Sequence, residues 1–477
     1  MRRTKILATL GPASEDKEVL RSMIRAGLNA VRCNFSHGTH EDHGKRIALV
    51  RQVAAEEGKT IGILADLQGP KIRVSRFKNK SITLASGSKF ILNADLDKEA
   101  GDETQVGLDY KALPKDVKKG DTLLLDDGKL IFQVDEVKGN CVHCIVIEGG
   151  VLSNNKGINK MGGGLTAPAL TDKDKADIIF IGTIKEVDYV AVSFPRSAED
   201  MIEARTLLRA ANSNASLIAK IERTEAVDKI LEVIDASDGI MVARGDLAVE
   251  IGEEFVPGVQ KKLIQQARTL DKIVITATQM MESMIENASP TRAEVSDVAN
   301  AVLDGTDAVM LSAETAAGKH PVKVIAEMNK ICRAAELHPA TRISKHRVEC
   351  HFNRVDEAVA MSAMYAANHI DAKAIIALTE SGATPVWMSR ISSHLPIYAL
   401  TPNIDTMGRL TLCRGVEPLY FNAKAHALTD INPKAVDELV QRQVVQEHDL
   451  VLMTFGDHVG LHGGTNQLKI VKVGQVV

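Results

Sequence analysis

The chain of 477 residues contains few aromatic side chains and few cysteines. Phe, Trp and Tyr make up only 3% of it, so the core must consist mainly of Ala, Val, Ile and Leu. Such cores favour helix-covered parallel sheets over aromatic-rich β-sandwiches. The six cysteines are too few for a disulfide framework, and we therefore expect a reducing, cytoplasmic location.

The chain also lacks long hydrophobic runs and an excess of charge of one sign. The longest stretch without a charged residue, 391–404, contains two prolines and is too short to span a bilayer. Lys and Arg number 58 and Asp and Glu number 62, which gives a net charge of −4. This balance argues against a surface dominated by nucleic-acid binding. We expect neither a membrane nor a nucleic acid as a partner, and the length predicts about three domains.

Eight short apolar segments recur along the chain, and helical periodicity follows them. The segments span residues 5–10, 30–35, 62–67, 187–194, 216–222, 239–246, 273–279 and 308–314. Near-continuous apolar strands that alternate with helices are typical of parallel sheets. Eight such units in succession predict a closed (β/α)₈ TIM barrel, and an open doubly wound sheet is the main alternative.

The third unit is interrupted by short alternating strands between residues 71 and 168. These strands are expected near 81–84, 89–92, 122–125 and 130–134. They predict a small β-barrel domain inserted after the third barrel strand. An insertion there emerges at the carboxyl ends of the barrel strands, where barrel enzymes carry their active sites, so it can act as a lid.

The remaining residues divide into two further units. We expect the catalytic barrel to comprise residues 1–70 and 169–343. Residues 344–477 alternate between helical and apolar strand patterns, which predicts a separate C-terminal α/β domain.

Polar residues occur repeatedly where the predicted barrel strands end. They are Arg32, Asn34 and Ser36 on the second strand, Asp66 on the third, Lys220 and Glu222 on the fifth, Arg244 and Asp246 on the sixth, Thr276 and Thr278 on the seventh, and Ser312 and Glu314 on the eighth. Residues two apart on a strand share a face, so these groups are expected to converge at one rim. Grouping charges there costs desolvation free energy unless they are paired or hold a ligand.

The residue types at this rim indicate the ligand. Glu222 and Asp246 offer oxygen ligands without a neighbouring Cys or His, which suits Mg²⁺ rather than zinc. Lys220, Arg32 and Arg73 supply cations for an anionic substrate, of which a phosphoryl compound fits best. The pattern therefore predicts a Mg²⁺-assisted barrel enzyme that acts on a phosphorylated anion under a lid.

Several longer motifs resemble the pyruvate kinase family over essentially the whole chain. They are NFSHG at 34–38, DLQGPKIR at 66–73, AKIE at 219–222, MVARGDL at 241–247, ATQM at 277–280 and PTRAE at 290–294. The segments DDG at 126–128 and NNKGIN at 154–159 are similar to the bacterial branch of that family. The resemblance implies transfer of the phosphoryl group of phosphoenolpyruvate to ADP, giving pyruvate and ATP.

The resemblance also implies roles for the residues at the rim. Glu222 and Asp246 would hold Mg²⁺, and Lys220 would stabilise charge on the phosphoryl group as it moves. Arg32 and Arg73 would fix the phosphates, and the backbone around Gly245 would bind the substrate carboxylate. Thr278 would help to protonate the enolate through a water relay, and Ser312 and Glu314 are further candidates for this relay. The alternative is that Thr278 has a purely structural role, with its hydroxyl bonded to its own backbone.

Two ligand sites follow from the same resemblance. Asn34, His37, Arg73 and Lys156 would contact the nucleotide, although His37 could equally be a capping residue. Asn34, Ser36, Asp66 and the Leu67 carbonyl match a site for a monovalent cation such as K⁺. Many relatives carry Glu at the position of Lys71, and we expect the Lys71 ammonium to make K⁺ dispensable here.

The C-terminal domain is expected to regulate the enzyme. The hydroxyl- and glycine-rich loop with Thr379, Ser381, Gly382 and Thr384 has the geometry of a phosphate site. The resemblance implies a phosphorylated allosteric effector there, enclosed by the loop 456–465, and a homotetramer. A Mg²⁺-dependent barrel lyase acting on pyruvate-like enolates and a non-catalytic metabolite sensor are the alternatives, but a lyase would lack Lys156 and a sensor would be expected to lose Lys220 or a magnesium carboxylate.

Overall fold

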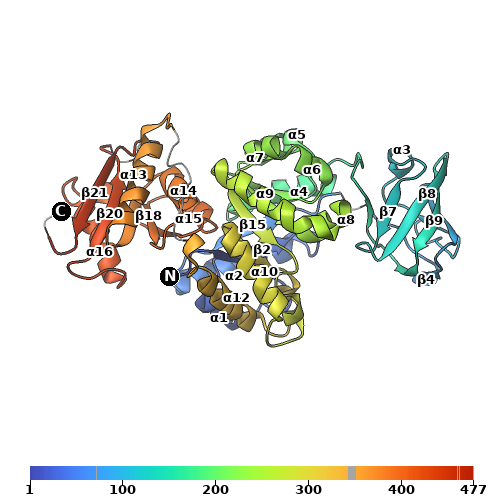
Figure 1. The fold of residues 1–477 in the computed structure, drawn as a ribbon, viewed down its shortest axis with the longest axis horizontal. Coiled ribbons are helices and arrows are strands. Elements are labelled where there is room, and N and C mark those ends of the chain that lie inside the picture. The colour runs from blue at the N-terminus through green and yellow to red at the C-terminus, as the bar shows by residue number, and fades with distance from the viewer. Residues whose placement is uncertain (71, 342–350, 459, 461, 476–477) are drawn as a thin grey trace.

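The fold is that of a computed structural model, which describes residues 1–70, 72–341, 351–458, 460 and 462–475. Three units lie in a row in Figure 1: a C-terminal unit, a central barrel and an inserted β-domain. The predicted fold class, a TIM barrel with an inserted β-domain and a C-terminal α/β domain, is confirmed. No helix among these described residues is long and apolar enough to cross a membrane.

The central unit is a closed barrel with the strand order β1-β16-β15-β14-β13-β12-β3-β2. Its strands are β1 (Lys5–Thr9), β2 (Ala30–Asn34), β3 (Gly62–Asp66), β12 (Tyr189–Val192), β13 (Ser216–Ile221), β14 (Gly239–Ala243), β15 (Ile273–Ala277) and β16 (Ala308–Leu311). All neighbouring pairs are parallel. The strands are almost entirely buried because helices cover them outside and opposite strands pack against them inside. The eight predicted strands are therefore confirmed.

Helices surround the barrel and share one large apolar core with its strands. They are α1 (Lys17–Ala26), α2 (His40–Glu56), α4 (Asp172–Ile184), α5 (Ala198–Ala210), α6 (Thr224–Asp228), α7 (Ile230–Ala236), α8 (Arg244–Ile251), α9 (Val256–Thr269), α10 (Arg292–Asp304), α11 (Ala313–Ala316) and α12 (Pro321–Ala335), with 3₁₀ turns at Glu253–Phe255, Glu282–Ile285 and Pro339–Thr341. Thr291 and Glu294 form a capping box at the start of α10. A cap of this kind stabilises a helix by about 1 kcal/mol.

All eight strands end before the residue that the sequence indicates, and for three of them this moves predicted site residues off the strand. β14 ends at Ala243, so Arg244 and Asp246 lie in the first turn of α8 and not on the strand. Thr278 follows β15 in a left-handed conformation with φ of 65°, and Glu314 lies in α11. Fully buried apolar residues such as Leu247 and Met280 follow soon after the strands, so the apolar pattern does not mark the point where a strand stops.

The inserted unit is built from β-strands around a core of its own. Its elements are β4 (Ser81–Leu84), β5 (Lys89–Asn93), β6 (Gln105–Gly107), α3 (Leu113–Asp116), β7 (Thr122–Leu125), β8 (Leu130–Lys138), β9 (Cys141–Glu148), β10 (Gly150–Ser153) and β11 (Ile158–Lys160). The strands form a six-stranded sheet, β11-β7-β8-β9-β5-β6, and a two-stranded sheet, β10-β4. The chain thus leaves the barrel after β3 and returns to it before β12.

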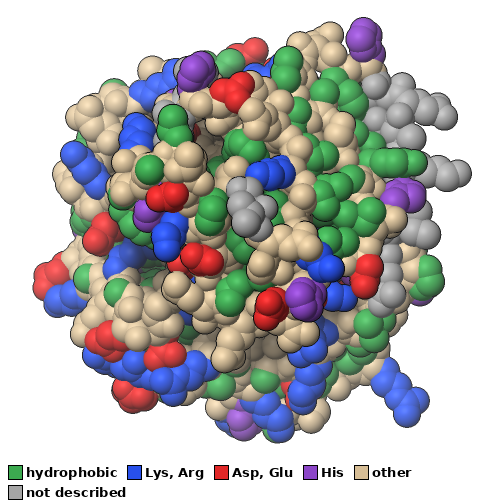
Figure 2. Space-filling view, turned by 90° about the vertical axis from the view of Figure 1, so that its left-hand side faces the viewer, with side chains coloured by type: hydrophobic (Ala, Val, Ile, Leu, Met, Phe, Trp, Pro, Cys, Tyr) green, Lys and Arg blue, Asp and Glu red, His purple; other side chains and the backbone are tan. Residues whose placement is uncertain are grey.

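The C-terminal unit is a five-stranded sheet with the order β19-β18-β17-β20-β21. Its elements are α13 (Val355–His369), β17 (Ala372–Leu378), α14 (Ala383–Arg390), β18 (Ile397–Thr401), α15 (Ile404–Leu410), β19 (Val416–Tyr420), the 3₁₀ turn Ala423–Ala425, α16 (Ile431–Gln441), β20 (Leu450–Phe455) and β21 (Gln467–Lys472). The sequence pattern missed β19, because Glu417 and Pro418 interrupt its apolar run. The predicted boundary at 343–344 falls outside the described residues. Acidic and basic side chains are mixed over the face of the molecule shown in Figure 2.

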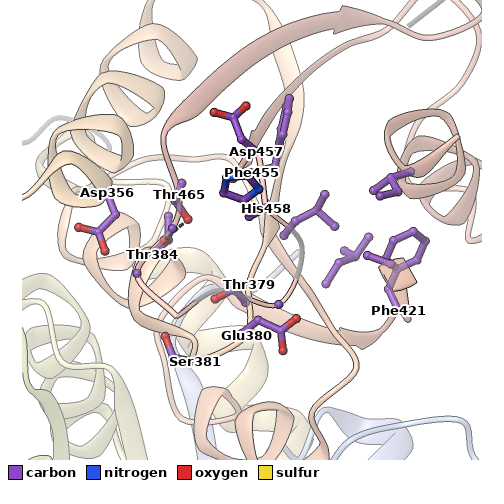
Figure 3. Close-up of a pocket in the computed structure, with 18 of the residues that line it drawn as sticks. Asp356, Thr379, Glu380, Ser381, Thr384, Phe421, Phe455, Asp457, His458 and Thr465 are labelled. Atoms are coloured by element: carbon purple, nitrogen blue, oxygen red, sulfur yellow. Dashed lines mark hydrogen bonds between the residues drawn. The ribbon is translucent and has the colours of Figure 1, made fainter. Parts of the chain in front are cut away.

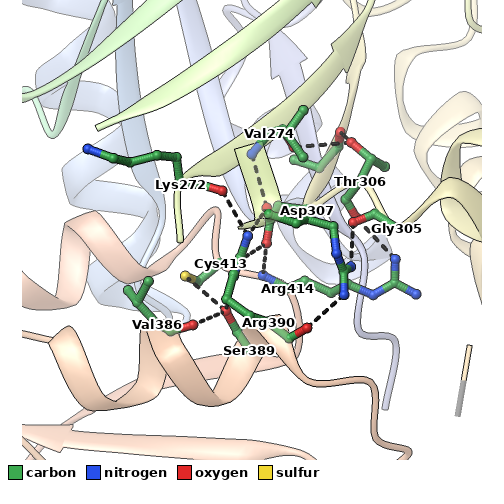
Figure 4. A network of polar contacts seen from close by, with 12 residues as sticks. Lys272, Val274, Gly305, Thr306, Asp307, Val386, Ser389, Arg390, Cys413 and Arg414 are labelled. Atoms are coloured by element: carbon green, nitrogen blue, oxygen red, sulfur yellow. Dashed lines mark hydrogen bonds and ion pairs between the residues drawn. The ribbon is translucent and has the colours of Figure 1, made fainter. Parts of the chain in front are cut away.

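A buried ion pair joins the C-terminal unit to the barrel (Figure 4). Arg390, the last residue of α14, donates from both terminal nitrogens to the carboxylate of Asp307, which precedes β16. Both side chains are only 1% exposed. The same carboxylate accepts the backbone N–H groups of Val274 and Arg414, each at 3.0 Å. The C-terminal unit is therefore attached at the amino ends of the barrel strands.

Candidate active site

A cavity of about 610 Å³ lies between the carboxyl ends of the barrel strands and the inserted β-domain. Nine of the residues predicted from the sequence line it: Arg32, Asn34, Ser36, His37, Arg73, Lys156, Lys220, Glu222 and Asp246. Five of the barrel strands or the turns after them contribute to its walls, together with the inserted domain. Lys71 lies outside the described residues.

Asp66 is at the centre of a charged cluster beside this cavity, although it is not itself among the described residues that line it. It ends β3, is 1% exposed, and accepts a hydrogen bond from Arg32 Nε at 2.6 Å. Lys220 Nζ lies 3.3 Å from its other oxygen. Burial opposes the charge of Asp66, but the two cations outweigh it and lower the pKa of its carboxyl. Asp66 is therefore ionised and holds Arg32 and Lys220 in place.

Lys220 connects Asp66 to Glu222. Its ammonium lies 2.8 Å from Glu222 Oε1 and donates a hydrogen bond of 2.8 Å to Ser193 Oγ. Burial alone would favour the neutral amine, yet Asp66 and Glu222 raise the pKa of Lys220 above its usual value. The side chain thus carries a charge in a buried position, where the field of that charge is poorly screened.

Glu222 and Asp246 are the two groups that fit a divalent cation. Burial raises the pKa of Glu222 to about 7, with Lys220 acting against this shift and Asp246 adding to it. Burial likewise raises the pKa of Asp246. Two neighbouring buried acids are costly without a counter-charge, which a divalent ion would supply. The described residues contain no group of three His, Cys, Asp or Glu side chains suited to a metal. Mg²⁺ is usually bound by only one or two carboxylates, with water and substrate oxygens as its other ligands, so Glu222 and Asp246 fit this ion.

Thr278 and Gly245 are bonded to each other. Thr278 Oγ1 accepts the N–H of Gly245 at 2.9 Å and donates to the carbonyl of Ala277 at 2.7 Å. Neither residue belongs to the described lining of the cavity. The hydroxyl thus has the backbone bond that a structural role requires, and it covers the N–H group that was predicted to bind the substrate carboxylate.

The oxygens predicted to bind a monovalent cation lie on β2, on β3 and in the turns that follow. Asn34 Oδ1 accepts the N–H of Ser36 at 3.1 Å, and the carbonyl of Leu67 accepts Ser193 Oγ at 2.7 Å. Asp66 is occupied by Arg32 and Lys220. The oxygens of Asn34, Asp66 and Leu67 therefore each already have a donor from the protein.

The inserted domain contributes cations to the opposite wall. Lys156 Nζ forms an ion pair of 2.8 Å with Asp126, whose pKa is lowered because Lys156 outweighs the effect of burial. Arg73 pairs with Gly157 through a β-bridge at the base of the insertion. His37 lies on the barrel side, and its carbonyl is hydrogen-bonded to His43 Nε2 at 3.0 Å. The predicted nucleotide contacts thus come from both sides of the cavity.

Ser193 is a site residue that the sequence reasoning missed. It follows β12 and links Lys220 to the carbonyl of Leu67. The next residue, Phe194, has a φ of 55° and donates its N–H to Glu222 Oε2 at 2.9 Å. A polar residue at the end of a predicted barrel strand was the pattern that identified the other rim residues. The same pattern, applied to the fourth strand, would have identified Ser193.

Arg244 and Thr276 do not contribute to the rim as predicted. Arg244 donates to the carbonyl of Thr278 at 2.6 Å and pairs with Asp297 at 2.7 Å, so it supports the turn after β15. Thr276 is fully buried, and its hydroxyl bonds to that of Thr306 at 3.0 Å. Arg244 lies in α8 because β14 ends earlier than predicted, whereas Thr276 lies within β15 and contacts Thr306, which precedes β16.

Glu314 supports two turns rather than facing the cavity lining. Its carboxylate accepts the N–H of Ser312 at 2.6 Å and that of Met281 at 3.2 Å. Burial raises the pKa of Glu314. Neither Glu314 nor Ser312 is among the described residues that line the cavity, which leaves both as candidates for a relay only through intervening water.

A second cavity, of about 210 Å³, lies in the C-terminal unit (Figure 3). Thr379 Oγ1 accepts the N–H of Gly382 at 2.9 Å, and Thr384 Oγ1 is 3.0 Å from Thr465 Oγ1. Gly382 has a φ of 83° and directly precedes α14, a conformation that a side chain would disfavour. Three of the four predicted effector residues, Thr379, Ser381 and Thr384, line this cavity, and segments of the loop 456–465 face them.

Comparisons with known proteins agree over the whole chain. Residues 1–325 match the family model described as "Pyruvate kinase, barrel domain", and residues 357–471 match "Pyruvate kinase, alpha/beta domain". The chain is similar to pyruvate kinase II of Salmonella typhimurium, with 54% identity over 99% of both chains. It is also similar to pyruvate kinases of Buchnera aphidicola, with 52% identity over 99% of both chains, and Haemophilus influenzae, with 54% identity over 96% of both. The chain belongs to the pyruvate kinase family and is a phosphotransferase.

Proposed function

We propose that the cavity between the barrel and the inserted domain transfers the phosphoryl group of phosphoenolpyruvate to ADP, giving pyruvate and ATP. The observation that carries the proposal is the buried cluster in which Asp66 holds Arg32 and Lys220, while Lys220 contacts Glu222. Such preorganised charges reduce the free energy of a phosphoryl-transfer transition state, because little reorganisation is needed as the reaction proceeds.

Glu222 and Asp246 would hold Mg²⁺. The bound ion would neutralise charge on the phosphoryl group and on the enolate oxygen. Both carboxyl groups must be ionised for this role, although burial alone favours their protonated forms. Lys220 helps to keep Glu222 ionised at a distance of 2.8 Å.

Arg32 and Lys220 bind the phosphoryl group of the substrate from the barrel side. Arg32 Nη2 has no hydrogen-bond acceptor in the part of the chain that the structure describes, whereas Nε is bonded to Asp66 and Nη1 to Thr9. Lys220 stabilises the negative charge that develops between donor and acceptor oxygens. Arg73 and Lys156 bind the phosphates of ADP from the lid side, with His37 and Asn34 beside them. The two groups of cations face each other across the cavity, which suits in-line transfer.

Protonation of the enolate carbon is the second step. Thr278 Oγ1 donates to a backbone carbonyl, so its hydroxyl reaches the enolate only after this bond rearranges or through a water molecule. We assign Thr278 the role of positioning the α8 start, through the N–H of Gly245, and of orienting that water. Ser312 and Glu314 lie further along the same relay.

A K⁺ ion at Asn34, Ser36, Asp66 and Leu67 is optional in this proposal. Arg32 and Lys220 already neutralise Asp66, and Lys71 adds a further cation in the same sequence motif. Turnover should therefore continue when K⁺ is replaced by a large organic cation. A loss of several orders of magnitude in kcat would reject this part.

The C-terminal cavity binds a phosphorylated activator, such as a sugar phosphate or a nucleoside monophosphate. The N–H groups and hydroxyls at Thr379, Ser381, Gly382 and Thr384 would hold its phosphate at the start of α14. A homotetramer and a cytoplasmic location belong to the same proposal, on the basis of family resemblance. Neither the lyase nor the sensor alternative is favoured by any feature of the site.

The test is a coupled assay of pyruvate formation from phosphoenolpyruvate and ADP. Activity should require Mg²⁺, and Glu222→Gln should lower kcat by about 10²-fold or more, since it removes a metal ligand and one of the two carboxylates that contact Lys220. Glu232→Gln, at an exposed glutamate on α7, is the matched control and should leave kcat unchanged. Full activity of Glu222→Gln would refute the assignment.

A further inference from the structure

A small cavity of about 20 Å³ lies beside the buried ion pair of Figure 4. Arg3, which precedes β1, and Arg268, on α9, line it from the barrel. Ser392 and Arg414 line it from the C-terminal unit, together with apolar side chains. The described lining thus contains three arginines and neither Asp nor Glu. It shares no residue with the lining of the active-site cavity or of the effector cavity.

The carboxylates around this cavity already have cations as partners. Asp307 pairs with Arg390 and also accepts two backbone N–H groups. Glu336 lies 3.7 Å from Arg3 Nε and accepts the backbone N–H of the same residue at 2.8 Å. Residues 271–272, in the turn after α9, contribute one acidic and one basic side chain. The acids near the junction are therefore used by other cations than those of the remaining two arginines.

Arg268 and Arg414 have no acidic partner of their own. Neither guanidinium forms an ion pair with a carboxylate in the described part of the chain. Arg268 instead donates to two backbone carbonyls at 2.9 and 2.7 Å, and Arg414 Nη1 donates to two others at 3.0 and 3.1 Å. Arg414 Nη2 and the Nε atoms of both residues have no hydrogen-bond acceptor among the described residues. Since a guanidinium carries five N–H groups, both side chains keep donors for a ligand.

The electrostatic result is an excess of positive charge in a buried place. Burial, together with the charges of Arg390 and Arg414, lowers the pKa of Arg268 to about 10, and Asp307 opposes this shift to a smaller extent. Burial also lowers the pKa of Arg414, against the attraction of Glu336 and Asp307. Both guanidinium groups still carry a charge at neutral pH. Buried charges of one sign are costly unless a counter-charge is present.

We propose that this cavity binds a monoatomic anion of the halide class, with the free N–H groups of Arg268 and Arg414 as its ligands. A volume of about 20 Å³ is sufficient for one particle slightly larger than water, which needs about 10–15 Å³, but is too small for a phosphate or carboxylate metabolite. Hydrogen bonds from two charged guanidinium groups offset the cost of dehydrating the ion. Because one arginine belongs to the barrel and the other to the C-terminal unit, the bound ion reduces the repulsion between the two units and stabilises their attachment.

Urea unfolding in sodium chloride and in sodium gluconate of equal ionic strength tests this proposal, with the fluorescence of Trp387 as the readout. Gluconate is too large for the cavity, so it screens charges without binding there. At a chloride concentration of about ten times Kd, the folding equilibrium constant should be about elevenfold higher than in gluconate. The absence of a chloride-specific increase up to about 1 M would overturn the proposal.

Arg268→Met should reduce the chloride-specific increase to below about twofold, because the variant removes one of the two ligands. Lys262→Met is the matched control, since Lys262 is exposed on the same helix and its loss removes the same charge. This control should respond to chloride as the wild type does. An equal response of Arg268→Met and the wild type would contradict the proposal, because chloride would then act at another cationic site.

A bromide soak of wild-type crystals gives a test that does not depend on the folding of Arg268→Met. The anomalous signal should place a bromide ion in the cavity, in contact with both Arg268 and Arg414. A cavity that holds only water, or bromide that is bound solely at other sites, would refute the assignment.

Discussion

Replacing Arg390 by Met tests the attachment of the C-terminal unit to the barrel. The side chain is 1% exposed, and its guanidinium makes two hydrogen bonds to Asp307 and one to the carbonyl of Lys272. Met has a similar length and no charge, so the variant removes the charge and its bonds without leaving a large cavity. Asp307 would remain buried with only the N–H groups of Val274 and Arg414 as donors.

The expected loss follows from the burial of both partners. Removing one member of a buried ion pair leaves an uncompensated charge and costs about 3–5 kcal/mol of unfolding free energy. Arg442→Met is the matched control, because Arg442 pairs with Glu438 at the surface, where a pair contributes about 1 kcal/mol or less. The difference between the two arginines thus measures the effect of burial.

Urea unfolding followed by tryptophan fluorescence reports this region directly. The chain has a single tryptophan, Trp387, which lies on α14 one turn before Arg390. The unfolding transition of Arg390→Met should shift to lower urea concentration, while that of Arg442→Met should stay close to the wild type. A loss below about 1 kcal/mol in Arg390→Met would refute the reasoning, because it would mean that the buried Asp307 does not need its partner.

Three further predictions concern single side chains. Burial lowers the pKa of His43 to about 4 from 6.5, so the unfolded chain takes up a proton before the folded chain does as the pH falls. The free energy of unfolding should therefore decrease by about 3 kcal/mol between pH 6.5 and pH 4. His43→Gln should remove this part of the pH dependence of urea unfolding. Asp126→Asn should raise the KM for ADP about tenfold in steady-state assays, because Lys156 loses the partner that orients it; an unchanged KM would contradict this. Thr384→Asp should abolish activation by sugar phosphates while basal kcat stays unchanged, since its carboxylate repels a phosphate at the start of α14; retained activation would locate the effector elsewhere.

The sequence predicted the barrel and much of the charged cluster for a physical reason. Lys220 and Glu222 are two residues apart, so strand geometry places them on one face. Asp66 was found by the same rule, because a charge at the end of an apolar strand needs a partner. Asp246 lines the cavity as predicted but was assigned to the wrong element, since the apolar pattern continues from β14 into α8.

The contacts between distant segments were beyond the reach of local patterns. Arg390 and Asp307 are 83 residues apart and belong to different units, so neither spacing nor periodicity relates them. The hydrogen bond between Thr278 and Gly245 depends on the left-handed conformation of Thr278, which no local sequence pattern predicts.

The central claim is that a lysine ammonium, oriented by two acids at the barrel rim, drives the movement of a phosphoryl group. Its most direct test is the rate of ATP synthesis by Lys220→Met at saturating phosphoenolpyruvate, ADP and Mg²⁺, beside Lys262→Met as a surface control. We predict a fall of about 10²–10³-fold in kcat for the first variant and none for the second. ATP synthesis by Lys220→Met within about threefold of the wild-type rate would contradict the account.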